Sequence, residues 1–214
     1  FFPQDTSRQD VLEFSTEPSS LETQDDVFFE WENLNKESYN YNIKTKVRTR
    51  NEYMKINKKV NFPIEAMPDP YEEYVLPSEI INSDDPLIID IASQLAEGED
   101  DLYVVVYKTA HWVKNNIEYS LSSVTEKASK EASWVLENKV GVCDEITSLF
   151  IAMLRGLGIP ARFVSGVSYT NSELFEDAWG PHGWAEVYFP GYGWVPFDVT
   201  YGEFGFIDAS HINM

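Results

Sequence analysis

The chain has 214 residues, of which 43% are hydrophobic and 14% aromatic, so it is long and apolar enough to bury a substantial core. Asp and Glu number 36 against 16 Lys and Arg, which gives a net charge of −20. A field of that sign repels nucleic acid and anionic membrane surfaces and attracts cationic segments, so we expect no nucleic-acid partner. The simpler interpretation of the charge is solubility.

The sequence leaves the cellular compartment open. A single cysteine, Cys143, excludes an internal disulfide. No apolar run approaches a membrane-spanning length, and no basic-plus-apolar signal segment occurs. The chain begins with Phe1-Phe2-Pro3 rather than Met, which is compatible with processing or clipping and with a membrane anchor outside this sequence.

The first third of the chain is expected to hold a tail and a small β-rich region. Residues 1–36 are acidic and aperiodic apart from a VFFEW patch, which predicts a tail that docks through its aromatic residues. Within residues 37–83, polar and apolar residues alternate from Tyr39 to about Phe62, which predicts two strands with a turn near Arg50-Asn51. A proline-punctuated connector follows and leads to residues 84–214, the expected catalytic core.

Three helices are expected before the cysteine. The first runs from Pro86 to about Ala96, behind a cap at Ser83, Asp84 or Asp85, and the second from Asp101 to about Asn116. A shorter helix spans Ala128 to Glu137. The apolar side of the second helix comprises Leu102, Val105, Val106, Thr109, Ala110 and Val113.

A further helix is predicted to begin at Cys143. Apolar residues recur at helical spacing from Ile146 to Leu157, and acidic residues occupy the first turn, as the helix dipole favours. Gly156, Gly158 and Pro160 end it. The apolar stripe would anchor this helix and leave its amino end to present the sulfur.

Two β-prone runs near the carboxyl end, WAEVYF and WVPFDV, are separated by the turn-rich PGYG and predict a hairpin. Odd-numbered positions form an apolar face, whereas His182 and Asp198 both occupy even-numbered positions. A register that places His182 directly opposite Asp198 requires an odd-numbered loop centred on Pro190, or a bulge. An even, bulge-free loop would separate the two side chains and leave Glu186 or a backbone carbonyl as alternatives.

Cys143, His182 and Asp198 are the residue types that thiol catalysis needs. The attacking species is the thiolate, and both a helix N-terminus and a neighbouring imidazolium favour it. The imidazole then delivers a proton to the leaving amine, and a carboxylate on its other nitrogen fixes its tautomer. A lone cysteine is otherwise most often a small buried hydrophobic residue, and Asp198 could equally be a turn residue.

The segment from about Leu102 to Gly202 resembles the transglutaminase-like superfamily of papain-like thiol enzymes. Four motifs occur in the family's order. They are Gly141-Val142-Cys143, Gly158-Ile159-Pro160-Ala161-Arg162, His182-Gly183-Trp184-Ala185-Glu186-Val187-Tyr188, and Gly193-Trp194 with Asp198. The resemblance implies an α+β, papain-like core in which the nucleophile helix packs on an antiparallel sheet, with a β-rich N-terminal extension.

The resemblance also implies roles: Cys143 as nucleophile, His182 as general acid/base and Asp198 as orienting residue. The reaction would be acyl transfer on amide bonds of proteins or peptides through a thioester, as in a protease, an amidase or a cross-linker. The lead-in helices resemble those of extracytoplasmic prokaryotic members, which favours an extracytoplasmic or cell-surface location without excluding the cytoplasm. The alternative is a non-catalytic scaffold or surface-interaction module that retains the fold.

The aromatic residues nearest the motifs are candidates for the substrate channel or an oxyanion donor, although most such residues serve the core. They are Trp134, Trp184, Tyr188 and Trp194. The backbone N–H of Cys143 is the expected first oxyanion donor. We expect no metal and no cofactor, because three histidines and one cysteine lack any short metal-ligand spacing. Of these, His111 and His211 are predicted to be ordinary helix-surface and tail residues.

Overall fold

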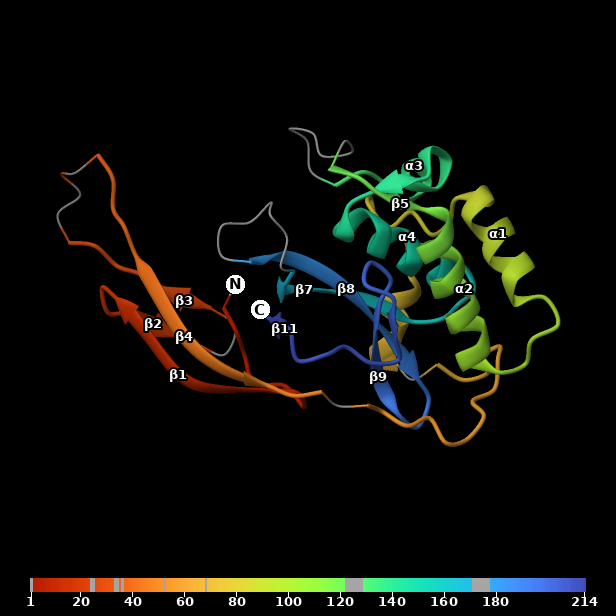
Figure 1. Cartoon of the computed structure of the whole chain (residues 1–214), viewed down its shortest axis with the longest axis horizontal. Helices are drawn as coiled ribbons and strands as arrows, with labels where there is room; N and C mark the ends of the chain where they lie inside the picture. The colour runs from red at the N-terminus through yellow and green to blue at the C-terminus, as the bar shows by residue number, and fades with distance from the viewer. Residues whose placement is uncertain are drawn as a thin grey trace.

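The computed structural model describes residues 2–23, 26–32, 35, 37–51, 53–67, 69–121, 129–170 and 178–214. Its helices gather at one end, an antiparallel sheet runs through the middle, and an arm of N-terminal strands projects at the other end (Figure 1). This arrangement confirms the predicted α+β class with a β-rich N-terminal extension.

The helix that carries the cysteine, α4 (Cys143–Gly156), lies at the centre of the core. Every side chain from Glu145 to Leu154 is buried. Three helices pack around it: α1 (Pro86–Ala96), α2 (Leu102–Asn116) and α3 (Ala132–Asn138). A core helix surrounded in this way has little freedom to shift, so its amino end is a fixed point.

The predicted boundaries of α1 and α2 are confirmed. Asp85 caps α1 by accepting the backbone N–H groups of Leu87 and Ile88, and Asp101 caps α2. All six residues predicted for the apolar side of α2 are buried. By contrast, α3 begins at Ala132 rather than at residue 128, which lies outside the described residues.

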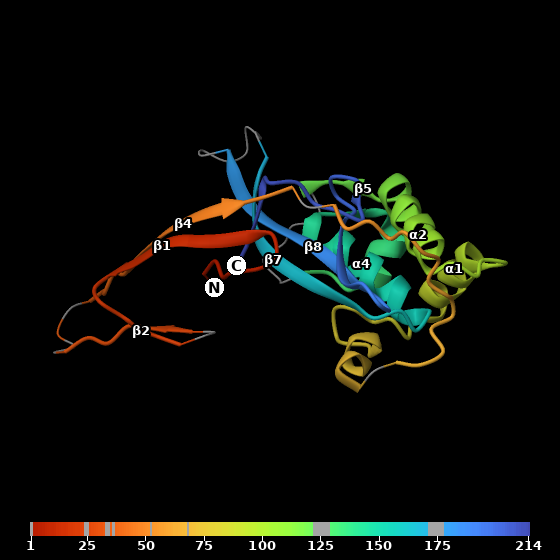
Figure 2. The same ribbon diagram turned by 90° about the horizontal axis from the view of Figure 1, so that it is seen from below.

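The sheet holds five strands in the order β10 (Glu203–Phe204), β9 (Gly193–Asp198), β8 (Trp179–Phe189), β7 (Ala161–Tyr169) and β11 (His211–Asn213). Every neighbouring pair is antiparallel. Strands β7 and β8 pack against α4. The helices gather at one end of these two strands, and the N-terminal arm lies at the other end (Figure 2). The helix that begins at Cys143 therefore packs on an antiparallel sheet, as predicted.

The hairpin β8–β9 has the predicted odd-numbered loop, but its register differs from the prediction. Phe189 pairs with Gly193, so the loop is Pro190 to Tyr192 and its centre is Gly191 rather than Pro190. Tyr192 N–H donates to the Phe189 carbonyl, and Gly191 has φ +83°. Proline followed by a glycine of positive φ is the signature of a type II turn, which places the loop one residue later than expected. The odd-numbered residues form the buried apolar face, as predicted.

The N-terminal arm corrects two predictions. Strand β1 (Gln9–Glu17) lies within the supposed irregular tail and pairs with β4 (Asn42–Thr49), and β2 (Leu21–Glu22) pairs with β3 (Val27–Phe28). The predicted hairpin across Arg50-Asn51 is wrong, because the described residues that follow it form no strand that pairs with β4. Opposite charges face each other across this pair: Lys46 in β4 and Arg50 just after it form ion pairs with Glu13 and Asp10.

The remaining elements are short. A 3-10 helix, η1 (Asp69–Val75), lies in the connector, and β5 (Glu118–Tyr119) pairs in parallel with β6 (Val140–Gly141) just before the cysteine. Within the described part of the chain, no helix has the length and apolar character needed to cross a membrane. The division into segments 1–36, 37–83 and 84–214 stays a prediction.

Candidate active site

Cys143 is the first residue of α4, directly after the cap residue Val142, and it is partly exposed. The buried carboxylate of Glu145 holds this entrance: one oxygen accepts the Val142 N–H at 3.0 Å and the other accepts the Lys130 N–H at 3.1 Å. An acidic residue in the first turn also complements the helix dipole. The thiol therefore lies at a rigid helix N-terminus and remains within reach of solvent.

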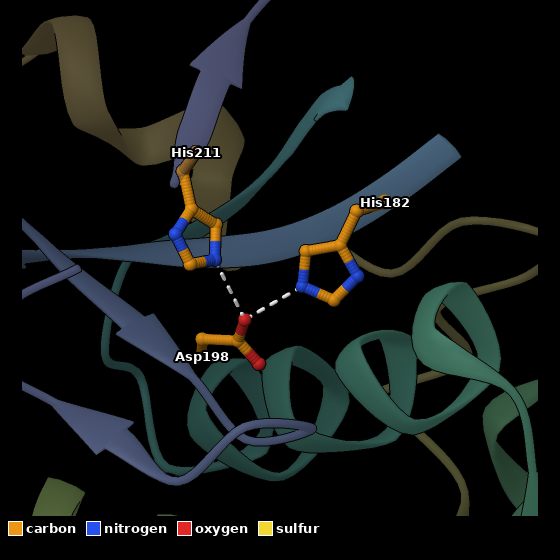
Figure 3. A group of neighbouring side chains, drawn as sticks. All are labelled: His182, Asp198 and His211. Carbon is orange, nitrogen blue, oxygen red and sulfur yellow. Dashed lines mark hydrogen bonds and ion pairs between the residues drawn. The ribbon is translucent and has the colours of Figure 1, made fainter. Parts of the chain in front are cut away.

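His182 on β8 and Asp198 at the end of β9 form a buried pair. The ring nitrogen Nε2 of His182 lies 2.6 Å from Oδ2 of Asp198 (Figure 3). His182 is 7% exposed and Asp198 is 0% exposed. Continuing the ladder beyond Ala185–Phe197 places Asp198 opposite Trp184, so His182 is its diagonal neighbour on the same face. The odd-numbered loop preserves this shared face despite the shifted register.

Four hydrogen bonds saturate the Asp198 carboxylate. Oδ2 pairs with His182 and, at 3.0 Å, with Nε2 of His211. Oδ1 accepts the backbone N–H groups of Thr200 at 2.7 Å and Tyr201 at 2.8 Å. An ionised carboxylate offers about four acceptor sites, so this one is fully satisfied. Asp198 is thus both the turn residue and the partner of His182.

Charge stabilises the protonated imidazole of His182. Burial alone would lower the pKa of His182, but hydrogen bonds and negative charge from Asp198 and Cys143 outweigh it and raise this pKa to about 9. Burial would likewise raise the pKa of Asp198, and its hydrogen bonds with His182 and His211 hold this pKa well below its usual range. Since Nε2 faces Asp198, the nitrogen left for the thiol is Nδ1 of His182. The arrangement favours an imidazolium between a carboxylate and a sulfur.

A direct bond joins the two elements that carry the thiol and the imidazole. Thr147 lies one turn beyond Cys143 in α4, and its hydroxyl donates to the carbonyl of Gly183 at 3.1 Å. Gly183 follows His182 in β8 and lies against the Phe163 ring, where a Cβ would overlap that ring. Because Thr147 is fully buried, this bond fixes the start of α4 against β8.

His211 is the residue that sequence reasoning missed. The prediction of an ordinary tail residue is wrong: its side chain is fully buried and contacts Asp198 (Figure 3). Burial would lower the pKa of His211, but the carboxylates of Asp198, Glu203 and Asp208 raise it. No motif marks His211, because it reaches the site from the edge strand β11.

The aromatic residues around His182 differ from those expected. Tyr201 stacks on the imidazole with ring centroids 4.5 Å apart, and its hydroxyl is 2.8 Å from Oγ of Ser168. Trp184 is only 1% exposed and packs edge-on against His211 at 5.3 Å. Trp184 therefore lies behind the imidazoles rather than facing solvent, and Tyr201 is the exposed aromatic side chain beside His182.

Two of the other aromatic candidates, Tyr188 and Trp194, lie away from His182. Tyr188 is six residues further along β8, which is about 20 Å at strand spacing. It pairs with Trp194 and stacks on Tyr71 at 3.8 Å. Trp134, on α3, packs against the core with Lys130 over its ring. The structure does not bring Tyr188 and Trp194 to the imidazole.

The ligand atoms of His182, Asp198 and His211 lie within 4.8 Å of one another, close enough to consider a metal ion. A tetrahedral zinc ion with bonds of about 2.0–2.1 Å separates its ligand atoms by about 3.3 Å. The observed His182–Asp198 separation of 2.6 Å is shorter and fits a direct charge-assisted hydrogen bond. The geometry is that of a hydrogen-bonded cluster.

Known proteins resemble this chain in sequence and fold. The uncharacterized protein YebA of Bacillus subtilis (strain 168) is 31% identical over an alignment of 149 positions, which covers 61% of this chain and 20% of YebA. An uncharacterized protein of Haemophilus influenzae is 31% identical over an alignment of 107 positions, which covers 41% of this chain and 29% of that protein. The chain thus spans less than a third of either relative's length.

A solved structure covers nearly the whole chain. It is a candidate cysteine protease from Cytophaga hutchinsonii, which superposes with a TM-score of 0.71 over 99% of this chain and 73% of that protein, at 21% identity. This likeness extends the shared fold to the N-terminal arm. The model of the transglutaminase-like superfamily matches residues 89–199. That match spans more than half of the 214 residues and includes all of α4, β8 and β9, so this chain belongs to the transglutaminase-like superfamily.

Proposed function

We propose that this protein is a cysteine-dependent acyltransferase that acts on amide bonds of proteins or peptides, with Cys143 as nucleophile, His182 as general acid/base and Asp198 as orienting residue. The observation that carries the proposal is the His182 imidazole between the Cys143 thiol and a buried, fully bonded carboxylate. A partner that stabilises the imidazolium also stabilises the thiolate beside it.

The first half-reaction follows from the roles of these groups. The thiol gives its proton to Nδ1 of His182, and the resulting thiolate attacks the amide carbonyl carbon. The backbone N–H of Cys143, at the start of α4, donates to the oxygen that becomes negative. His182 then passes the proton to the amide nitrogen, the C–N bond breaks, and an amine leaves a thioester on Cys143.

The second half-reaction returns the enzyme. Water or a primary amine attacks the thioester carbon, His182 takes a proton from the attacking group, and the thiol is released. Water makes the enzyme a protease or amidase, whereas a lysine amine makes it a cross-linker. The net charge of −20 favours cationic peptides as substrates. The expected location outside the cytoplasm rests on the family resemblance and stays a prediction.

Two measurements test the proposal together. Iodoacetamide at neutral pH reports whether Cys143 is a reactive thiol, because it is the only cysteine in the chain. Mass spectrometry of a glutamine-containing peptide incubated with the protein and a primary amine distinguishes hydrolysis, amine incorporation and no change. We expect rapid alkylation, one of the two peptide products, and loss of that product after alkylation.

Cys143→Ala and Cys143→Ser serve as matched controls. Each is expected to abolish the peptide product and to leave thermal unfolding nearly unchanged, because a partly exposed thiol contributes little packing. A Cys143 that alkylates no faster than a free thiol, in a protein that changes no peptide, would instead support the non-catalytic scaffold. A product that persists in Cys143→Ala would place the chemistry elsewhere.

A further inference from the structure

The Asp198 carboxylate serves two histidines, only one of which the proposed reaction uses. His211 points its Nε2 at Asp198, at 3.0 Å, and its Nδ1 at the Asp208 carboxylate, at 3.2 Å. Glu203 lies 4.0 Å from the same Nδ1. The His211 side chain has no exposure to solvent. Both ring nitrogens therefore face acceptors, so His211 can donate to both only as an imidazolium.

The segment that carries His211 is anchored from two sides. Strand β11 pairs with β7, where His211 lies opposite Ser168. On its other side, the Gln9 side chain acts as a substitute strand: its Nε2 donates to the Asn213 carbonyl at 2.9 Å, and its Oε1 accepts the Asn213 N–H at 2.9 Å. Gln9 is only 2% exposed. A buried side chain that replaces two ladder bonds defines the position of β11 closely.

The arm makes further bonds to the residues just before β11. Arg8 donates to the Asp208 carbonyl at 3.0 Å, and Thr49 donates to the Ala209 carbonyl at 2.6 Å. The Ala209 N–H in turn donates to the Asn51 side chain at 2.5 Å. The start of β1 and the end of β4 thus both bond to the segment 208–213. These residues form the base of the arm, which is therefore joined to the residues around His211.

We propose that His211 is a positioning residue of the active site, which holds the Asp198 carboxylate for His182, and that the base of the N-terminal arm sets the position of His211. This inference deepens the proposed function and rests on its assignment of His182 and Asp198. The path has three links: Gln9 to Asn213 in β11, His211 to Asp198, and Asp198 to His182.

The physical reason is the sharing of one oxygen. Oδ2 of Asp198 accepts hydrogen bonds from both imidazoles. The bond from His211 therefore helps to fix the orientation of the carboxylate in which Oδ2 faces Nε2 of His182. Without His211, Oδ2 keeps a single partner and the carboxylate can rotate about the bonds that Oδ1 makes with Thr200 and Tyr201. A purely structural buried histidine would change stability and leave the His182 hydrogen bond intact.

Three variants test this inference. His211→Ala removes the donor, whereas His211→Gln keeps an amide N–H near the position of Nε2. Gln9→Ala cuts the tie between the arm and β11. Lys46→Ala is the matched control, because Lys46 lies in the same strand pair and its side chain bonds across it to Glu13, on the exposed side of the arm.

Two readouts are taken beside thermal unfolding. One is the NMR signal of the His182 Nε2–H proton, which can be assigned because the chain has only three histidines. The other is the rate at which iodoacetamide alkylates Cys143 at pH 7. The proton signal reports the geometry of His182 and Asp198 even without any catalytic turnover.

We expect His211→Ala to broaden or shift the His182 proton signal and to slow alkylation about tenfold, the equivalent of one lost hydrogen bond to a charged group. His211→Gln should restore the signal and most of the rate, Gln9→Ala should lie between the two, and Lys46→Ala should match the unmodified protein. If His211→Ala does not fold, His211→Gln and Gln9→Ala decide.

An unchanged His182 signal in His211→Ala, with or without a lower unfolding temperature, would overturn the inference. So would equal effects of Ala and Gln at position 211. An unreactive Cys143 in the unmodified protein is a different result: it overturns the proposed function, while the proton signal still decides whether His211 positions the pair.

Discussion

Replacing Asp198 by Asn should disable the site through the tautomer of His182 rather than through loss of shape. The oxygen of the new side-chain amide must stay with the backbone N–H groups of Thr200 and Tyr201, since an NH2 placed there would face two donors. The NH2 then faces Nε2 of both His182 and His211, and each of these nitrogens can accept only when it carries no proton. The proton of the neutral His182 ring is left on Nδ1, where it cannot take the proton of the Cys143 thiol.

The size of the effect follows from the pKa of His182. Asp198 is the largest of the influences that raise this pKa from 6.5 to about 9, against the opposing effect of burial. A shift of that size corresponds to about 3 kcal/mol and to a factor of roughly 300 in the ratio of protonated to neutral imidazole. The wrong tautomer costs more, about 10³–10⁴ in turnover for an orienting carboxylate of this kind.

The assay combines turnover of the glutamine peptide with an NMR titration of the His182 ring. We expect turnover in Asp198→Asn to fall about 10³-fold or more, and the titration midpoint to move from about 9 to 6.5 or below. Asp84→Asn, an exposed substitution before α1, makes the same change in net charge and should alter neither quantity. A midpoint that stays within half a unit of the unmodified protein, or turnover within about tenfold of it, would refute the reasoning.

Three other predictions concern residues that hold Cys143, His182 and Asp198 in place. Thr147→Val leaves the Gly183 carbonyl without its hydrogen bond to α4, so we expect the free energy of unfolding in denaturant to fall by about 1–3 kcal/mol and the alkylation of Cys143 to slow. Thr109→Val is the control: its buried hydroxyl bonds to Val105 within α2, so its loss should lower stability and leave alkylation unchanged. Because the pKa of His182 is raised to about 9, its stabilising contribution is complete below pH 6.5 and is lost as pH rises through about 9, so this residue alone should lower the free energy of unfolding by roughly 3 kcal/mol between about pH 6 and pH 10. His182→Gln should reduce the pH dependence by that amount and leave the part that comes from His211, whose pKa is also raised. A Cβ at Gly166 would overlap the backbone of β11, so Gly166→Ala should lower the unfolding temperature. By displacing β11 it should also slow the alkylation of Cys143, as His211→Ala does. Normal alkylation in a destabilised Gly166→Ala would contradict the proposed link between β11 and the active site.

Local signals allowed the helices to be predicted. Asp85 and Asp101 cap the helices that follow them, and the apolar stripe after Cys143 has helical spacing, so each boundary depends on residues within one or two turns. The shared face of His182 and Asp198 was also predictable, because strand parity depends only on whether the loop is odd. The register itself was not, since it depends on which residues form the type II turn.

Contacts between distant segments could not be predicted in this way. The pairing of β1 with β4 joins residues between about 25 and 40 positions apart, and the alternation that marks β4 as a strand does not say which strand it pairs with. His211 has the same difficulty, because its bond to Asp198 depends on where the edge strand β11 lies beside β7. The apolar stripe of α4, by contrast, is complete within one stretch of sequence.

The four groups of the site are graded in their exposure, and this grading suits the proposed chemistry. Cys143 is partly exposed, His182 is 7% exposed, and Asp198 and His211 are 0% and 2% exposed. A peptide can reach the sulfur, whereas the carboxylate and the second histidine lie where water does not weaken their charges. The buried end is also the end to which β11 and the base of the N-terminal arm are attached. Substitutions at the base of the arm that break its bonds to β11, such as Gln9→Ala, should therefore act on the orientation of His182 and on the rate of the chemical step, rather than on the affinity for substrate.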